Sequence, residues 1–351
     1  MLTLVPGGMG GSETYARALT RQLDGIHDVS AIALVPAGAA GFSEGIPERV
    51  VEQIRGGSST RDRLTTIATA TIRARVIRRL TTDNDVVHFP FTVPVPRPGR
   101  HQGFVQSLLD VQHLDLPQLF SRPELAYRRH FYQGAAKRAD VVITISDFAK
   151  RRMVELLGLP AERIRVAHLG VDPTAFVPNF GERENFVLYP ARGWTHKNHS
   201  RLVEAMAIVR TSTPGIRLVL TGGNLDALGP LPEWVDRLGL VSTEKLHSLY
   251  RSAAAIAFPS LYEGFGLPPL EAMASGCPAA VSTAGSLPEV CGDAAILFDP
   301  LDVGAIAAGI ETAIENRASL AAAGVRQAAR FTWEACRDVH LSAYRQADQS
   351  V

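Results

Sequence analysis

The stretch Ala254–Ser282, AAIAFPSLYEGFGLPPLEAMASGCPAAVS, shows how the second half of the chain is built. It opens with the apolar run 254–258, passes through a loop rich in glycine and proline, and reaches a helix candidate at 269–275 before a second apolar run at 278–282. An apolar run without alternation is typical of a strand that is buried on both faces of a parallel sheet. A strand, a loop, a helix and a second strand in this order predict a βαβ unit.

The same alternation extends along the rest of the chain. The strand candidates are 29–35, 85–89, 103–108, 141–145, 164–167, 186–189, 217–221, 254–258, 278–282 and 294–298, and the helix candidates are 12–23, 61–80, 123–137, 147–157, 199–211, 243–252, 269–275, 303–315 and 319–329. This pattern predicts parallel sheets that helices cover on both faces. It stops and restarts across Gly170–Gly181, so we predict two doubly wound α/β domains joined by that segment.

The composition excludes several classes of protein. A formal net charge of +1 gives no strong overall field, so we expect no nucleic-acid partner. The first half is mildly basic, which fits an acidic acceptor, an anionic membrane surface or ordinary variation between domains. No apolar run reaches 18 residues, and no basic leader precedes an apolar segment. The three cysteines, Cys277, Cys291 and Cys336, form no C-x-x-C pair, so a reducing cytoplasm is the expected location.

The N-terminal segment combines a short apolar run with a glycine-rich loop. The run Leu2–Val5 is the candidate first strand; because such strands usually have about 5–6 residues, either the start codon is misassigned or the strand is short. The loop Gly7–Gly11 leads from it into the helix candidate 12–23. Glycines let a backbone approach a ligand closely, and a helix N-terminus attracts anions. The spacing is not G-x-G-x-x-G, which disfavours nicotinamide binding, and a plain tight turn is the alternative.

Two loops of the second half carry candidate binding residues. Arg192 and Lys197 lie in the loop directly after the strand candidate 186–189, where both can reach a diphosphate; a solvated basic loop is the alternative. Glu263 and Glu271 lie eight residues apart across the loop that opens the helix candidate 269–275, so they can accept hydrogen bonds from different hydroxyls of a sugar nucleotide. Two solvated glutamates are the alternative. No Asp-x-Asp follows a strand to hold a metal–diphosphate, so no metal is expected.

These segments resemble the retaining GT-B glycosyltransferases of family GT4, also called glycosyltransferase group 1. Pro259–Gly276 is similar to the E-x7-E signature of that family, and Trp194–Asn198 is similar to its W-x-H-K-N loop. Other segments are similar to its N-terminal glycine loop, its next donor-side turn and the start of its closing helix: Gly7–Gly11, Ser286–Val290 with Gly292–Ala294, and Phe331–Glu334.

The resemblance implies a GT-B fold, in which two Rossmann-like domains face each other across a cleft. It implies an acceptor-side domain over 1–172, a nucleotide-sugar-binding domain over 173–330 and a C-terminal helix over 331–351 that crosses back. The implied reaction moves a hexose with retention from a GDP- or UDP-linked donor, GDP-mannose being favoured, to a glycan or lipid-linked acceptor, without metal or cofactor. A nucleotide-sugar epimerase of the same architecture and an inactive nucleotide-sugar-binding protein stay open as alternatives.

The resemblance also implies a role for each candidate residue of the site. Most of these residues belong to the second domain. The set comprises Glu271 at the ribose hydroxyls, Glu263 at the donor sugar, Arg192 and Lys197 at the diphosphate, Phe265, Gly266 and Leu267 with backbone N–H groups at the sugar, Gly222 after the strand candidate 217–221, and Gly10 with Gly11 approaching the phosphates from the first domain. Without a metal, the two cations have to offset the charge that grows on the leaving diphosphate.

One departure from the family pattern concerns the first domain. The family often has a His-Asp pair there, and Leu109 stands where that His would be, next to Asp110. His113 then either takes a catalytic contact with the acceptor or the donor sugar, or has a structural role.

A basic segment of the first domain suggests a second surface. Arg73, Arg75, Arg78 and Arg79 share the helix candidate 61–80 with several apolar residues. Either this helix makes peripheral contact with an anionic bilayer, at the inner face of the cell membrane, or it is an ordinary solvated face.

Overall fold

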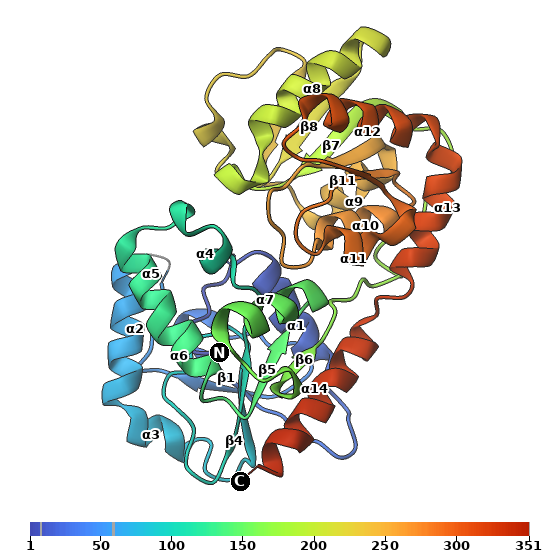
Figure 1. The fold of residues 1–351 in the computed structure, drawn as a ribbon. Coiled ribbons are helices and arrows are strands. Elements are labelled where there is room, and N and C mark those ends of the chain that lie inside the picture. The colour runs from blue at the N-terminus through green and yellow to red at the C-terminus, as the bar shows by residue number, and fades with distance from the viewer. Residues whose placement is uncertain (8, 58–59, 351) are drawn as a thin grey trace. The chain divides into compact units, whose positions relative to one another are not determined.

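The computed structural model describes residues 1–7, 9–57 and 60–350, and these residues form two compact units (Figure 1). The N-terminal unit comprises Met1–Leu169 with Trp333–Val351, and the C-terminal unit comprises Gly170–Thr332. Every strand pairing recorded in the two units is parallel. The prediction of an α/β fold with parallel sheets is therefore confirmed.

The C-terminal unit holds a six-stranded sheet in the order β12-β11-β10-β7-β8-β9. Its strands are β7 Glu184–Pro190, β8 Arg217–Thr221, β9 Val235–Gly239, β10 Ala253–Phe258, β11 Ala279–Ser282 and β12 Ile296–Phe298. The chain runs outward from β7 through β8 to β9, then returns to the other side of β7 as β10. This is the doubly wound order, and its strand order reverses between β7 and β10. Ligands of such sheets bind at that point, beyond the carboxyl ends of the strands.

The helices of the C-terminal unit cover this sheet (Figure 1). They are α8 His199–Ser212, α9 Thr243–Ser252, α10 Leu267–Ala274, α11 Leu287–Cys291, α12 Val303–Glu315 and α13 Arg317–Ala328. Two of them begin at side-chain caps: Ser242 Oγ accepts from the Lys245 N–H at 3.3 Å, and Asp302 Oδ1 accepts from the Ala305 N–H at 3.0 Å. Helix α10 instead begins at Gly266, whose φ of 101° suits glycine, and it starts two residues before the predicted Pro269.

The N-terminal unit divides its strands between two sheets, β1-β2 and β3-β4-β5-β6. The strands are β1 Ala33–Pro36, β2 Glu48–Val51, β3 Val86–Phe89, β4 Gly103–Ser107, β5 Val141–Thr144 and β6 Ile164–Val166. The helices are α1 Gly11–Gln22, α2 Thr60–Ile72, α3 Ala74–Arg79, α4 Gln112–Asp115, α5 Arg122–Arg128, α6 Gly134–Ala136, α7 Asp147–Leu157 and α14 Trp333–Asp348. None of the helices described is both long and apolar enough to cross a bilayer.

Buried hydrogen bonds attach the C-terminal helix α14 to the N-terminal unit. The Tyr15 hydroxyl lies 2.6 Å from His340 Nε2 on α14, and the Tyr344 hydroxyl lies 2.9 Å from His88 Nδ1 on β3. Burial lowers the pKa of His340 to about 4 and that of His88 well below its usual range, so both rings are neutral at pH 7. Because buried polar atoms need partners, this network specifies where α14 packs.

Several sequence-based expectations for the N-terminal unit are wrong. Leu2–Val5 forms no strand, because the Leu4 N–H donates to the Met1 carbonyl at 3.1 Å and closes a turn instead. The predicted helix 61–80 is broken at Arg73, after a run of threonines and isoleucines of low helix propensity. The predicted helix 123–137, by contrast, forms: it is helical from Arg122 to Ala136, with a π-helical turn over Arg129–Gln133.

Two strands were missed because they lack the apolar run on which the prediction depended. The strand β2 has the sequence ERVV, and β9 has the sequence VDRLG. Each pairs on one side only, β2 with β1 and β9 with β8, and each is partly or fully exposed at most of its positions. A strand at a sheet edge can carry polar residues that an inner strand excludes.

Candidate donor-binding site

The loops after β7 and β10 meet at the point where the strand order reverses. Lys197 Nζ lies 2.5 Å from Glu263 Oε1, and the two side chains are only 14% and 12% exposed. The backbones of the loops also meet, because the Leu261 N–H donates to the His196 carbonyl at 2.8 Å. A mostly buried ion pair therefore stands at the place where a parallel sheet of this topology binds its ligand.

Asn198 holds the loop that carries Lys197 in place. Its backbone is left-handed, with φ of 60°, and the residue is 4% exposed. Its amide donates to the Pro259 carbonyl at 3.0 Å and to the Pro300 carbonyl at 2.7 Å, so one side chain ties together three loops. The buried Tyr189 hydroxyl donates to the Lys197 carbonyl at 2.6 Å. The ammonium group is thus presented by a backbone with little freedom to move.

The segment after β11 fixes Glu263 in the same way. Gly285 has φ of 67°, and a Cβ there would lie 2.5 Å from the Glu263 carbonyl oxygen, so only glycine fits. The Ser286 N–H and Oγ both donate to that oxygen, at 3.2 and 3.1 Å. This is the turn that resembles the next donor-side turn of GT4 enzymes, and here it holds the carboxylate's backbone.

Arg192 lies nearby in the first part of the β7 loop. Its guanidinium carbon lies 5.4 Å from the centre of the Trp194 ring, and within the described residues it makes no ion pair. Gly222 supports this part of the loop, since a Cβ there would lie 2.5 Å from the Ala191 carbonyl oxygen and 3.1 Å from the Arg192 nitrogen. Gly222 therefore lets two loops pack backbone to backbone. Arg192 is a cation left available to an anionic ligand.

Helix α10 carries the second glutamate. Its first turn contains Pro268 and Pro269, which have no N–H, so the Leu267 N–H is the first donor that the helix offers. Glu271 Oε2 accepts from the buried Tyr250 hydroxyl at 2.9 Å. Burial raises the pKa of Glu271 to about 7, and the tyrosine hydrogen bond lowers it only in part. A carboxyl group poised to ionise near neutral pH is typical of a functional site.

Comparison with known proteins agrees with this geometry. The family model "Glycosyl transferases group 1" matches residues 172–330, and the model "Glycosyltransferase Family 4" matches residues 9–175. An O-antigen chain mannosyltransferase from Escherichia coli is 31% identical over 272 residues, which is 71% of each chain.

The chain belongs to glycosyltransferase family 4.

Further relatives and solved structures agree with this assignment. An MMP alpha-(1->4)-mannosyltransferase from Mycolicibacterium hassiacum is 30% identical over 234 residues, 60% of this chain and 55% of that protein. The fold is similar to sucrose-phosphate synthase from Thermosynechococcus elongatus, with a TM-score of 0.78 at 19% identity over 97% of this chain and 94% of that one. It is also similar to Anabaena HepE in complex with UDP-glucose, with a TM-score of 0.67 at 19% identity over 97% and 95%. These similarities show the GT-B fold.

The residues predicted for this glycosyltransferase site divide between the two units. Arg192, Lys197, Gly222, Glu263, Phe265–Leu267 and Glu271 all lie in the C-terminal unit, on the loops after β7, β8 and β10 and on α10. Gly10, Gly11 and His113 lie in the N-terminal unit. Gly10 precedes α1 with φ of 56°, and Gly11 is the first residue of that helix. Gly8 of the same loop lies outside the described residues.

His113 is 1% exposed and lies on α4. Its Nε2 lies 3.2 Å from the Gln133 amide nitrogen, and its ring meets that of Tyr132 edge-on. Burial, together with the charge of Arg128, lowers the pKa of His113 to about 4. The ring is therefore neutral at pH 7, and its contact with a substrate stays a prediction.

Asn198, Gly285 and Ser286 were given no role from the sequence, although two of them fall in the quoted motifs. Their role is to hold the backbones of Lys197 and Glu263, and only the folded chain shows which carbonyl each one meets. The signal that was present was an asparagine directly before a helix, a residue that tolerates left-handed backbone.

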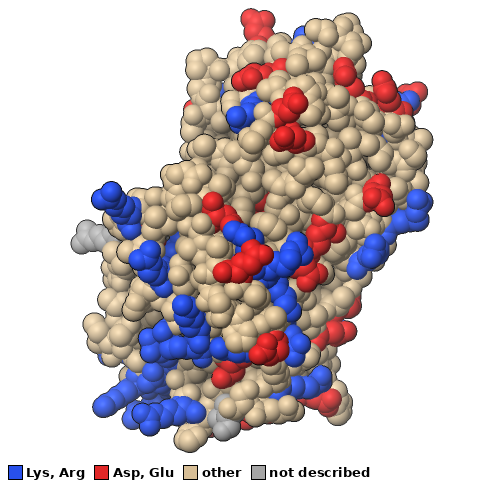
Figure 2. Space-filling view, viewed as in Figure 1, with Lys and Arg blue, Asp and Glu red and all other residues tan. Residues whose placement is uncertain are grey.

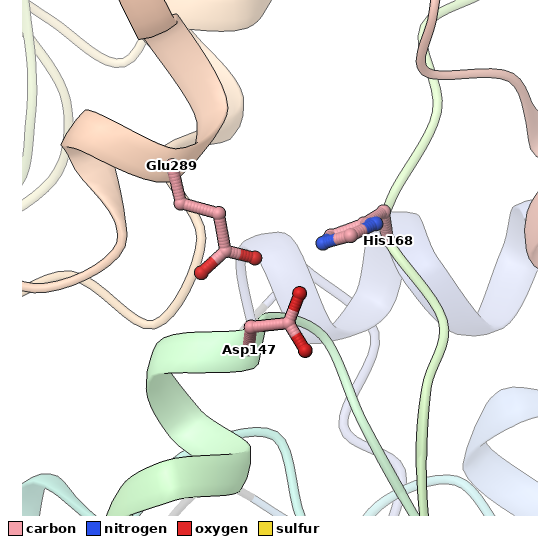
Figure 3. A group of neighbouring side chains, drawn as sticks. All are labelled: Asp147, His168 and Glu289. Carbon is pink, nitrogen blue, oxygen red and sulfur yellow. The ribbon is translucent and has the colours of Figure 1, made fainter.

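Figure 3 labels three further side chains that offer metal-ligating atoms. In the N-terminal unit, Asp147 begins α7 and His168 follows β6, with ligand atoms within 4.8 Å of each other. Glu289 lies on α11 of the C-terminal unit. A single aspartate and histidine supply fewer ligands than the three or four that a protein gives to zinc. This pair by itself therefore assigns no metal to its unit.

Proposed function

We propose that this family 4 glycosyltransferase transfers a hexose with retention of configuration and without a metal. The donor is a nucleotide-sugar bound by the C-terminal unit, GDP-mannose being the first candidate. The observation that carries the proposal is the Lys197–Glu263 pair at the strand-order reversal, with Arg192 beside it on the same loop. The acceptor is a glycan or a lipid-linked molecule on the side of the N-terminal unit, to which the closing helix α14 also belongs.

The names of the relatives support mannose, and one structural neighbour keeps UDP-linked donors in the set. Two relatives are called mannosyltransferases, and HepE was solved with UDP-glucose. A thermal-shift screen of nucleotide-sugars tests the donor, because a ligand at 100 times its Kd adds about 2.7 kcal/mol of stability. Product analysis with the donor found then separates three functions: transfer to an acceptor, release of an epimerised donor, and binding without turnover. An epimerised donor or no turnover would reject the proposed transfer.

The chemistry follows from the charges of the site. Arg192 and Lys197 share the loop after β7. We assign both to the diphosphate, where their charges offset the negative charge that grows as the glycosidic bond to the diphosphate breaks. Glu263 holds the Lys197 ammonium in place and presents a carboxylate oxygen to the sugar hydroxyls. Glu271 accepts hydrogen bonds from the ribose hydroxyls, and the backbone N–H groups of Phe265, Gly266 and Leu267 orient the sugar.

We expect chelation to leave activity unchanged. The candidate site meets the diphosphate with two cationic side chains, which do the work that a divalent ion does in metal-dependent enzymes. Initial rates are measured in excess EDTA and after addition of Mg²⁺ or Mn²⁺. Loss of turnover in EDTA that either ion restores would show that the two side chains are not sufficient.

A basic surface of the N-terminal unit supports peripheral binding to an anionic membrane. Figure 2 shows that Lys and Arg side chains gather over the part of this unit that carries α3. The arginines of α3 are Arg75, Arg78 and Arg79. Two apolar residues near them in the sequence are exposed, Ile72 by 80% and Val76 by 45%. Basic residues beside exposed apolar ones are the composition of a helix that lies at the bilayer surface. We propose that this surface brings the enzyme to a lipid-linked acceptor at the inner face of the cell membrane.

We expect the full chain to bind vesicles that contain phosphatidylglycerol and not vesicles of phosphatidylcholine alone. Arg75→Ala should weaken binding about fivefold, because a basic residue near the surface contributes about 1 kcal/mol. Ile72→Asp should weaken it further, and flotation measures both. The matched controls are Arg326→Ala and Ile208→Asp, exposed positions of the C-terminal unit. An equal loss of vesicle binding in variants and controls would show that α3 is an ordinary solvent-exposed helix.

A further inference from the structure

The two cations of the loop after β7 are held in different ways. Lys197 has an ion-pair partner, since its Nζ lies 2.5 Å from Glu263 Oε1. The Arg192 guanidinium, by contrast, makes neither a hydrogen bond nor an ion pair among the described residues. It lies over an aromatic ring instead, with its central carbon 5.4 Å from the centre of the Trp194 ring. Trp194 is 47% exposed, although tryptophan is highly buried on average in proteins.

A tight turn brings Arg192 and Trp194 together. The Trp194 N–H donates to the Arg192 carbonyl at 2.7 Å, the hydrogen bond of a γ-turn with Gly193 at its centre. The loop after β8 holds this turn, because the Gly193 N–H donates to the Gly223 carbonyl at 3.0 Å and the Asn224 amide donates to the Gly193 carbonyl at 3.1 Å. A Cβ at Gly193 would overlap the Asn224 carbonyl, so this close approach requires glycine. The backbone that carries the two side chains is therefore fixed.

A third ring lies beside Trp194. The centre of the His196 ring is 5.7 Å from that of Trp194, and the His196 carbonyl accepts from the Leu261 N–H at 2.8 Å. Burial, together with the charge of Lys197, lowers the pKa of His196 to about 4, so this ring is neutral at pH 7. The indole thus has one neutral and one cationic neighbour, and the π-electrons attract the cation.

We propose that Trp194 is a positioning residue for the reaction, and that its ring holds the Arg192 guanidinium ready to meet the diphosphate. This inference rests on the proposed function, which assigns Arg192 to the diphosphate. A cation over an aromatic ring is held through its charge and uses none of its N–H donors, so these donors stay available to phosphate oxygens. A free arginine loses rotamer entropy when a ligand immobilises it, whereas an arginine already held on a ring loses less. Trp194 thus strengthens diphosphate binding through Arg192.

The test is a double-mutant cycle on the full chain, with the Kd of GDP and of UDP measured by calorimetry. The cycle comprises Arg192→Ala, Trp194→Ala and the double variant. Trp194→Tyr keeps an aromatic ring, and Trp194→Leu keeps an apolar side chain without one. Trp234→Ala is the matched control, because Arg210 lies over the Trp234 ring at 5.2 Å in the same unit. Trp234 directly precedes β9, at the amino end of that strand, whereas ligands of such sheets bind at the carboxyl ends.

We expect Trp194→Ala and Trp194→Leu each to weaken nucleotide binding about two- to fivefold, which corresponds to the 0.5–1 kcal/mol of an exposed cation–π contact. Trp194→Tyr should restore most of this loss, and Trp234→Ala should show none. Arg192→Ala should weaken binding more than either Trp194 variant. In the Arg192→Ala background, Trp194→Ala should cause no further loss, because the cation that the ring holds is gone.

Three results would overturn the inference, and they separate it from the proposed function. Wild-type affinity in Trp194→Ala, with a loss in Arg192→Ala, would reject the role of Trp194 and leave the diphosphate assignment intact. Additive losses in the double variant would show that Trp194 acts independently of Arg192. An unchanged Kd in Arg192→Ala would reject both this inference and the assignment of Arg192 to the diphosphate.

Discussion

Lys197→Ala is expected to lower kcat/KM by about 10²–10³-fold, the loss that is typical when one electrostatic stabiliser of a transition state is removed. The Lys197 charge is already offset by Glu263, whose Oε1 lies 2.5 Å from Nζ. As the bond to the diphosphate breaks, negative charge grows on the leaving oxygens. The attraction between these oxygens and the Lys197 ammonium is therefore stronger in the transition state than in the ground state. The donor Kd should therefore change much less than kcat/KM.

The measurement is steady-state kinetics and donor calorimetry on one purified preparation. Lys245→Ala is the matched control, because Lys245 is an exposed lysine of the same unit whose side chain has no hydrogen-bond or ion-pair partner among the described residues. Removing Lys197 leaves the Glu263 carboxylate buried without its counter-ion, which destabilises a protein by about 3–5 kcal/mol. Tm and far-ultraviolet circular dichroism accordingly accompany the kinetics, and assays are run below the Tm of the variant. If kcat/KM matches that of Lys245→Ala, the diphosphate lies elsewhere.

Glu271→Ala is expected to weaken donor binding by about 10–150-fold, because charged hydrogen bonds to a ligand contribute about 1.5–3 kcal/mol. The Tyr250 hydroxyl donates a hydrogen bond of 2.9 Å to the Glu271 carboxylate. The carboxylate is therefore already oriented when a ribose binds. Glu204→Ala, an exposed glutamate on α8, is the matched control. Unchanged calorimetric affinity in Glu271→Ala would remove this residue from the donor site.

The pKa of Glu271 predicts how the affinity for the donor depends on pH. Burial raises the pKa of Glu271 to about 7, so in the free enzyme the carboxyl is mostly protonated at pH 6 and mostly ionised at pH 8. Ribose hydroxyls donate to the ionised form and stabilise it, which lowers the pKa on binding and releases a proton. Affinity should then rise about tenfold from pH 6 to pH 8. Glu271→Gln should flatten this dependence, and a pH profile that persists in that variant would assign the titration to another group.

The sequence by itself determined the class of fold and the loops that carry the site. Apolar runs such as 254–258 and 278–282 and the helices between them are set by residues within a turn or two of one another, so periodicity recovers them. Because the strands are parallel, residues that directly follow strands lie at one edge of the sheet. This geometry is enough to select Arg192 and Lys197 after β7 and Glu263 after β10 as candidate residues of the site.

The tertiary structure decided which of these residues meet. Lys197 and Glu263 are 66 positions apart, and they meet because β10 lies beside β7 in the sheet. Asn198 and Pro300 are 102 positions apart, and their hydrogen bond joins the loops after β7 and β12. Strand order depends on how the whole sheet packs, and no local pattern encodes it. The same holds for the raised pKa of Glu271, because the groups that surround its carboxyl come from segments far apart in the sequence, such as Tyr250.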